Sequence, residues 1–527
     1  MRISWLTIII CLSIIGCSIS KTGVGNSASD VSPYDFGFSQ AKTGEERYNV
    51  ILRTHQAAVR QGVNVNYQGV KSVEIEVPEK AVRIPLTRMN DFKGCTFVIK
   101  NVRKTVYLFE SREKTLPISI PKSNIDRGEF RDVPQLTKGT HLLLIEDANP
   151  WVENRKGYSY GHQRKDILLI QDGIARNKVV MPYNNEQSEP VCKYIGAEVS
   201  SIEIKNLTIS RTESSSAITN VFYITGKNGV KITNFILCTP ENERRNDRAI
   251  RIDDCTNVQF ENVTIDGTYS SQEHSGYGIS FDNVWNFHGN HLDGKANWGV
   301  FGTNNVNTAR IENSDINRFD IHCYGRDVSF SKVNFSDKYN QLNSVFGDIV
   351  FDRCTFTNYD PIRIGSSYNA YVPYDVYFND CVFNASGKNK CLLRIGVLDD
   401  EENTRKELKE KCWPNVYIKN LTVNLDKGIR DFTIYYASID GRESQIPIHN
   451  ISTIDVDGMK INSPYDDIVF SITPKQVKTI EEVNCVVEKV SVNGKRINTN
   501  DNRRIRTNMP LRKGIVRSRY SKLLKRK

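Results

Sequence analysis

The chain has 527 residues, of which 39% are hydrophobic and 25% charged, and its length alone would allow about three domains. The formal net charge is +10, but the segment 502–527 holds eleven Lys or Arg and no acidic residue, so the remainder sums to 10 − 11 = −1. The basic balance therefore belongs to the tail, and we expect no nucleic-acid partner. The twelve Cys show no Cys-x-x-Cys pair and no Cys/His spacing, which excludes a zinc site of the usual kind.

The N-terminal residues have the pattern of an export signal. Residues 1–16 begin with Met1-Arg2 and continue as an apolar run that is too short to span a membrane as a mature helix. The sequence that ends at Cys17 resembles the lipobox of bacterial lipoproteins, which implies lipidation of Cys17; an ordinary signal peptide is the alternative. We therefore expect an exported protein, lipid-anchored to the cell envelope of a Gram-negative bacterium at the outer membrane, the surface or the periplasmic face. Residues 17–42 are rich in Ser, Gly and Asp and predict a flexible tether.

A helix is predicted directly after the tether. Thr43 and Glu46 form a capping-box pattern, and Gly62 is a typical helix end, so we expect a helix over 43–62. Its apolar face is formed by Tyr48, Leu52, His55 and Val59. We interpret His55 as a packing residue and the helix as a cover for the open end of the strand-rich fold that follows.

Strand-like runs follow at 72–77, 95–100, 105–110 and 141–146. The segment from Trp151 to Lys165 interrupts them with aromatic and cationic residues, among them Tyr158. This mixture suits sugar stacking and carboxylate binding. A solvated loop with extended side chains is the alternative.

The middle of the chain repeats one eight-residue phrase in which positions 1, 3, 6 and 8 are mostly apolar. Copies begin at Ile202, Val230 and Val258, more loosely at Trp285 and Ala309, and again at Val328, Ile349, Val376 and Val416. Steps of two residues indicate short β-strands, and the step of three between them indicates a bend. A period of roughly 20 to 30 residues without an intervening helix indicates a stacked repeat architecture.

Most copies carry Asn at position 5, namely Asn206, Asn234, Asn262, Asn313 and Asn420. With this feature the chain resembles the right-handed parallel β-helix of the pectin-lyase-like superfamily, in which such amides form ladders at tight corners. The resemblance implies an all-β fold, a single-stranded right-handed parallel β-helix over 43–498 with an N-terminal capping α-helix, followed by a basic tail at 499–527. We expect the coil interior to contain Phe319, Ile321, Cys323, Phe335, Phe356 and Phe383. Cys354 and Cys381 are expected as stacked buried thiols, with a disulfide as the alternative.

Each coil has a further strand before the phrase, and alternation predicts which of its side chains point outward. Because Phe319, Ile321 and Cys323 point inward, Asp320, His322 and Tyr324 point outward together. The same reasoning places outward Arg251, Asp253, Asp282, Arg363 and Arg394. In the families that this chain resembles, the same face carries the active site. A salt-bridged solvated face is the alternative.

Two reactions suit this face. β-Elimination on a uronic-acid polysaccharide needs cations for the carboxylate, a base and an acid. We assign the proton transfers to His322 and Tyr324, with Asp320 and Arg326 beside them. The expected substrate-binding residues are Arg251, Arg363, Arg394, Trp298, Trp151 and Tyr158. The second reaction is glycoside hydrolysis by paired carboxylates, using Asp282 with Asp320 or with Asp253.

Motifs of known families limit the prediction. The calcium-binding aspartates of pectate lyases and the catalytic set of polygalacturonases are missing, and Asp253-Asp254 alone does not replace them. The sequence therefore predicts a protein that degrades an extracellular polysaccharide, with elimination favoured over hydrolysis. A glycan-binding or adhesion lipoprotein without catalysis is the third reading. No cofactor or metal ligand set is evident, and a divalent cation such as calcium stays an open alternative.

Overall fold

The structure is a computed structural model. It describes residues 30–104, 106–149, 163–180, 182–184, 188–196, 199–211, 219–238, 249–266, 277–295, 299–322, 325–337, 339–343, 345–357, 361–365, 374–387, 389–397, 411–412, 415–439, 448–449, 452–474, 483–499 and 503–507. The predicted lipidation residue Cys17 lies outside these ranges. Among the described residues, no helix combines the length and the hydropathy needed to cross a bilayer.

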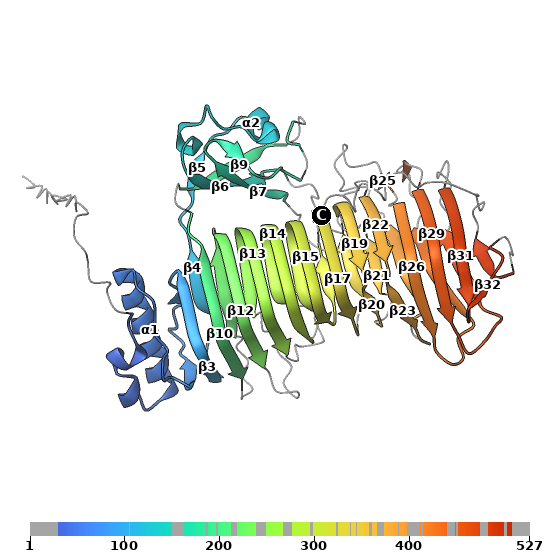
Figure 1. The fold of residues 1–527 in the computed structure, drawn as a ribbon. Helices are drawn as coiled ribbons and strands as arrows, with labels where there is room; N and C mark the ends of the chain where they lie inside the picture. Colours follow the sequence, from blue (N-terminus) through green and yellow to red (C-terminus); the bar gives the residue numbers. More distant parts are fainter. Residues whose placement is uncertain are drawn as a thin grey trace, which may run out of the picture.

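Successive parallel strands form the main body of the molecule. The phrase copies pair one above the other, with Ile202 opposite Val230 and Val230 opposite Val258. Each coil thus stacks on the one before it, as expected for a parallel β-helix, and Figure 1 shows the strands as one long row. The copy expected at Trp285 begins instead at Phe287, the register partner of Val258. The apolar Trp285 misled the prediction because it packs outward, against a second hydrophobic cluster.

The phrase strands turn a corner in the middle of the phrase and are β1 (Ser72–Val77), β3 (Met89–Val102), β10 (Ile202–Arg211), β12 (Asn228–Cys238), β17 (Arg326–Phe335), β19 (Phe346–Asp352), β20 (Thr355–Phe356), β22 (Tyr374–Asn379), β23 (Val382–Ala385), β26 (Asn415–Leu425), β29 (Ser452–Asn462) and β31 (Val483–Val492). A short last strand, β32 (Lys495–Arg496), pairs antiparallel with β31. The strands that precede the phrases are β2 (Ile84–Pro85), β4 (Val106–Arg112), β11 (Thr219–Thr225), β16 (Phe319–Ile321), β18 (Asn340–Asn343), β21 (Ile362–Gly365), β24 (Cys391–Val397), β27 (Asp431–Ile439), β30 (Val469–Pro474) and β33 (Ile505–Thr507). Three long strands contain both parts: β13 (Ile250–Asp266), β14 (Tyr277–Lys295) and β15 (Gly299–Ile316). We call the side formed by the preceding strands, with the first halves of β13 to β15, the site face.

The coil interior is apolar, as the sequence predicts. Phe319, Phe335, Phe356 and Phe383 are fully buried. Aromatic rings also stack from coil to coil: the ring centre of Phe351 lies 5.3 Å from that of Phe330 and 5.0 Å from that of Phe378. The thiols of Cys354 and Cys381 are buried and free. Burial raises the pKa of the Cys354 thiol well above its usual range, so it behaves as an apolar group.

Asparagine ladders hold the corners. Asn206, Asn234 and Asn262 have φ angles of 59°, 52° and 54°, in the left-handed region that Asn tolerates better than most residues. Each amide Nδ2 donates to the side-chain oxygen of the preceding coil, at 3.1 Å from Asn262 to Asn234 and 2.9 Å from Asn234 to Asn206. The predicted ladder is confirmed.

The N-terminal end is covered by a helical cap, which confirms the prediction. It comprises η1 (Pro33–Phe36), η2 (Phe38–Gln40) and α1 (Gly44–Gln61), with the Thr43–Glu46 capping box formed and Gly62 in the left-handed conformation at the end. His55 is completely buried, with Nδ1 2.9 Å from the Pro85 carbonyl oxygen and Nε2 2.9 Å from the Tyr67 hydroxyl. Its role in packing is therefore confirmed.

Residues 116–195 do not continue the coils, contrary to the sequence prediction. They form an antiparallel sheet beside the β-helix (Figure 1), which we call the insert. It contains β5 (Leu116–Ile118), α2 (Lys122–Arg127), η3 (Pro134–Leu136), β6 (Thr140–Asp147), β7 (Lys165–Gln171), β8 (Ile174–Ala175) and β9 (Pro190–Ile195). Strands β6 and β7 are apolar on both faces because one face packs on the insert's own core and the other on Trp285 and Ile195. At the base of the insert, the Lys227 ammonium contacts Glu113 before β5 and, at 2.7 Å, the Ser200 hydroxyl after β9.

The C-terminal boundary also differs from the prediction. The tail was expected to begin at residue 499, but β33 pairs in parallel with β30, with Ile505 opposite Phe470. Ile505 is buried in the main core. Because the side chain of Ile505 is apolar and buried in the core, residues 505–507 of the basic segment pair with the last coil. A separate two-stranded pair consists of β25 (Lys411–Cys412) and β28 (Ile448–His449).

Candidate functional site

Two rows of outward residues cross the site face. The first row, in register from coil to coil, is Tyr223, Arg251, Ser280, Gly302, Asp320, Gln341, Arg363, Arg394 and Tyr436. The second row is Asp253, Asp282 and Asn304, and it continues at His322, whose backbone N–H donates to the Thr303 carbonyl at 2.8 Å. Asp282 and Asp320 therefore lie in different rows, while Asp253 and Asp282 are direct neighbours.

A cluster of polar contacts surrounds Asp320 on the site face. The Asp320 side chain is 2% exposed although it lies on the outward side. Its Oδ2 accepts hydrogen bonds from the Arg318 guanidinium and from the Tyr277 hydroxyl, both at 2.5 Å. Its Oδ1 lies 3.0 Å from Nε2 of His322, whose side chain is 25% exposed. A buried carboxylate thus orients an accessible imidazole.

The charge state of Asp320 follows from these contacts. Burial alone would raise its pKa, but His322, Arg318 and the Tyr277 hydrogen bond outweigh that effect and hold the pKa below its usual range. The ionised Asp320 thus holds Arg318 and Tyr277 on Oδ2 and faces Nε2 of His322 with Oδ1.

Aromatic rings extend the cluster toward later coils. The guanidinium of Arg318 lies 4.4 Å from the ring centre of Tyr339, and that of Arg363 lies 3.8 Å from the same ring. The guanidinium of Arg394 lies 5.4 Å from the ring centre of Tyr436. Cation–π contacts of this kind fix the orientation of the guanidinium groups.

The earlier coils carry acid–base pairs instead. Nε of Arg251 donates to both carboxylate oxygens of Asp253, at 3.1 and 2.8 Å. Burial raises the pKa of the Asp253 carboxyl to about 6, against the opposing effect of Arg251. Arg83 pairs with Glu110 and lies 5.1 Å from the Tyr223 ring centre.

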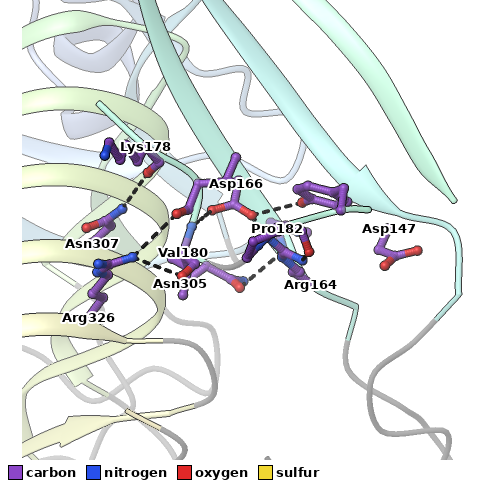
Figure 2. A network of polar contacts seen from close by, with 12 residues as sticks. Asp147, Arg164, Asp166, Lys178, Val180, Pro182, Asn305, Asn307 and Arg326 are labelled. Carbon is purple, nitrogen blue, oxygen red and sulfur yellow. Dashed lines mark hydrogen bonds and ion pairs between the residues drawn. The ribbon is translucent and has the colours of Figure 1, made fainter. Parts of the chain in front are cut away.

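The insert supplies a cation to the second row. Nζ of Lys165 lies 2.8 Å from Oδ2 of Asp282, whose Oδ1 accepts from Asn305 at 3.2 Å. Figure 2 shows neighbouring polar contacts of the insert, among them Arg164, whose Nε donates to Asp166 at 2.9 Å. The insert is therefore attached along the edge of the site face.

Arg326 takes part in this attachment and is not brought to Asp320. Its Nη1 donates to the Val180 carbonyl of the insert at 2.9 Å (Figure 2). Residue 326 follows the corner after His322 and pairs with Asn307, so its side chain leaves the site face. The sequence alone gave no sign of a partner at this corner.

The other predicted residues divide into two groups. Tyr324, Trp298, Trp151 and Tyr158 lie outside the described residues. Arg251, Asp253, Asp282, Asp320, His322, Arg363 and Arg394 all lie on the site face. Sequence reasoning missed Tyr277, Arg318 and Tyr339, which come from strand ends and corners where alternation predicts no direction. Within the described part of the chain, no group of three or more His, Cys, Asp or Glu residues has the geometry of a metal site.

Comparisons with known proteins support the fold. The chain is similar to the tailspike protein gp49 from Pseudomonas phage LKA1, with a TM-score of 0.56, 14% identity, and 88% of this chain and 81% of that chain covered. More distant similarities are to the tailspike gp61 of Pseudomonas phage phi297 (TM-score 0.45, 12% identity, 87% and 84% covered) and to the gp54 tailspike of Acinetobacter baumannii bacteriophage AP22, solved in complex with A. baumannii capsular saccharide (0.46, 11%, 86% and 79%).

No protein-family model and no curated protein sequence matches the chain. At 14% identity the likeness to gp49 concerns the fold, which is mostly β with a long parallel sheet. The class that fold and comparison define is thus an elongated parallel β-helix protein.

Proposed function

We propose that the chain binds and cleaves an extracellular, uronic-acid-containing polysaccharide on the site face by β-elimination. The observation that carries this proposal is the Asp320–His322 pair, in which a buried ionised carboxylate holds an accessible imidazole at 3.0 Å. Such a pair has the composition of a positioned general base. Solenoid faces of this type also suit long polymers.

The elimination would use residues of both rows. The imidazole of His322 takes the proton from C5 of a uronic-acid unit, the electron pair forms the C4–C5 double bond, and the C4–O glycosidic bond breaks. The leaving oxygen takes its proton from Tyr324, which alternation places next to His322 in the sequence prediction. An arginine of the first row neutralises the sugar carboxylate, on which charge accumulates during proton removal.

A hydrolytic reaction is the second candidate, and one observation favours it. Asp253 and Asp282 are register partners in adjacent coils with backbones about 4.8 Å apart, so they are neighbouring carboxylates of the kind that a retaining glycosidase uses. The pKa of Asp253 is raised to about 6, which suits a general acid. In that reaction Asp282, held by Lys165, is the nucleophile.

The products distinguish these reactions. Purified protein is incubated with acidic and neutral polysaccharides while the ultraviolet absorbance of unsaturated sugars and the number of reducing ends are followed. New absorbance together with reducing ends supports elimination, and reducing ends alone support hydrolysis. Retardation of the protein in a glycan-containing gel without either signal identifies a binding or adhesion protein. Absence of cleavage and of retardation with every glycan refutes the proposed function.

We also propose export and lipid anchoring through Cys17, on the basis of the lipobox pattern. That location would expose the site face to polymers outside the cytoplasm.

A further inference from the structure

The site face is electrically asymmetric on the two sides of Asp320. On the side of the earlier coils, the outward groups include the carboxylates of Asp253, Asp282 and Glu110. Each of these carboxylates is paired with a cation, Asp253 with Arg251, Asp282 with Lys165 and Glu110 with Arg83, so the charges of the earlier coils are balanced. On the side of the later coils, the first-row positions are Gln341, Arg363, Arg394 and Tyr436. Among the described outward positions of that half of the first row there is no acidic residue.

The two arginines of the later coils are built as a pair. Arg363 and Arg394 are register partners in adjacent coils, which places their backbones about 4.8 Å apart. Each guanidinium lies over an aromatic ring, Arg363 over Tyr339 at 3.8 Å and Arg394 over Tyr436 at 5.4 Å. A guanidinium stacked in this way keeps its N–H groups in a fixed plane, the geometry that recognises a carboxylate with two hydrogen bonds.

Their position relative to the cluster is set by the coil count. Arg363 lies two coils and Arg394 three coils beyond Asp320, or about 10 and 14 Å along the axis. Tyr339 also contacts Arg318, which bonds to Asp320. The arginine pair is therefore continuous with the proposed centre through one shared ring.

We infer that Arg363 and Arg394, backed by Tyr339 and Tyr436, form an acidic-sugar subsite that binds carboxylates of the polymer on the later-coil side of His322. The earlier coils, with Asp253 and Asp282, then receive neutral sugar units through hydroxyl groups. The preferred substrate class is a polysaccharide with acidic units positioned toward the C-terminal coils. This inference rests on the proposed function, because it needs a polymer along the site face.

Affinity electrophoresis tests the subsite with polygalacturonate, alginate and hyaluronan as probes, each also in carboxyl-reduced form. We expect the wild type to be retarded by at least one acidic polymer and Arg394→Met to bind that polymer about tenfold more weakly, the usual worth of a charge-assisted contact. Tyr436→Phe should keep the affinity, and Tyr436→Leu should lower it. Arg353→Met is the matched control, since Arg353 is an exposed arginine paired with Asp352 away from the site face.

The outcomes separate the inference from the proposed function. If the wild type binds an acidic polymer and Arg363→Met and Arg394→Met bind it equally well, the subsite is refuted and the proposed function stands. Equal retardation of the wild type by the acidic and the carboxyl-reduced polymer also refutes the subsite and leaves the proposed function standing. If the panel of the preceding section gives neither cleavage nor retardation, the proposed function fails, and the subsite with it. Weaker binding of Arg394→Met to the acidic polymer alone, with Arg353→Met unchanged, supports the subsite.

Discussion

Replacement of Asp320 by Asn tests the buried charge cluster of the site face. The Arg318 side chain is fully buried, and Asp320 is 2% exposed, so the variant leaves a buried guanidinium without this counter-ion. Loss of one member of a buried pair costs about 3–5 kcal/mol. We expect the free energy of unfolding to fall by that amount, measured by urea denaturation with circular dichroism.

The pH dependence of the free energy of unfolding is a second test of the Asp320–Arg318 pair. The pKa of Asp320 is lowered in the folded state, so its contribution to stability is present above the ordinary carboxyl pKa of about 4 and is lost as the pH falls through the lower folded value. In Asp320→Asn this loss of stability at low pH should be absent, because the amide does not ionise. The double variant Asp320→Asn with Arg318→Met should lose less than the sum of the two single variants, because no uncompensated charge remains. A loss below about 1 kcal/mol for Asp320→Asn would refute the assignment of a tightly coupled buried pair.

Four further predictions concern other parts of the chain. Burial lowers the pKa of His55 to about 4, so the unfolded chain binds a proton at this residue before the folded chain does. The free energy of unfolding should therefore be highest above pH 6.5 and fall by up to about 3 kcal/mol as the pH drops from 6.5 to 4. A His55→Gln variant with the same pH profile would contradict this. Phe356→Ala should cost about 3–5 kcal/mol in urea denaturation, and a cost under 1 would contradict its place in the core. His322→Ala should lower turnover by roughly 10²–10⁴ with little loss of stability in urea denaturation, whereas full turnover would place the base elsewhere. Cys17→Ala should move the folded protein from the membrane to the soluble fraction, and retention after a carbonate wash would disprove the anchor.

The sequence predicted the repeating part of the fold well because periodicity reports directly on burial. The alternation of Phe319 and Ile321 with Asp320 places two residues inside and one outside, and the burial of both apolar side chains agrees. The asparagine ladder was equally readable, since Asn tolerates the left-handed corner conformation.

The insert was missed because β6 and β7 consist of unbroken apolar runs, which look like coil strands. A local signal was present, however. Asp172-Gly173 joins β7 to β8 with positive φ angles of 49° and 78°, and this dipeptide between two strands is a typical hairpin turn. A hairpin is antiparallel and cannot belong to a parallel coil.

The candidate site was predictable only in part, for a similar reason. Alternation identified Asp320 and His322 but gave no partner for them, because Tyr277 and Arg318 lie at strand ends where side-chain direction is not fixed by a period of two. Arg326 was misplaced because the sequence did not reveal that the insert occupies its corner.

A glycine links the coils at the centre of the site. Gly302 is the register partner of Asp320, and a side-chain carbon at Gly302 would overlap the ring of Tyr277. The bare position lets that ring lie across the face, so its hydroxyl reaches Asp320 in the next coil but one. The same ring covers the outward side of the strand, which accounts for a carboxylate that faces outward and is nevertheless buried. The surroundings of His322 thus depend on a residue without a side chain one coil earlier, a dependence that no outward-residue pattern in the sequence displays.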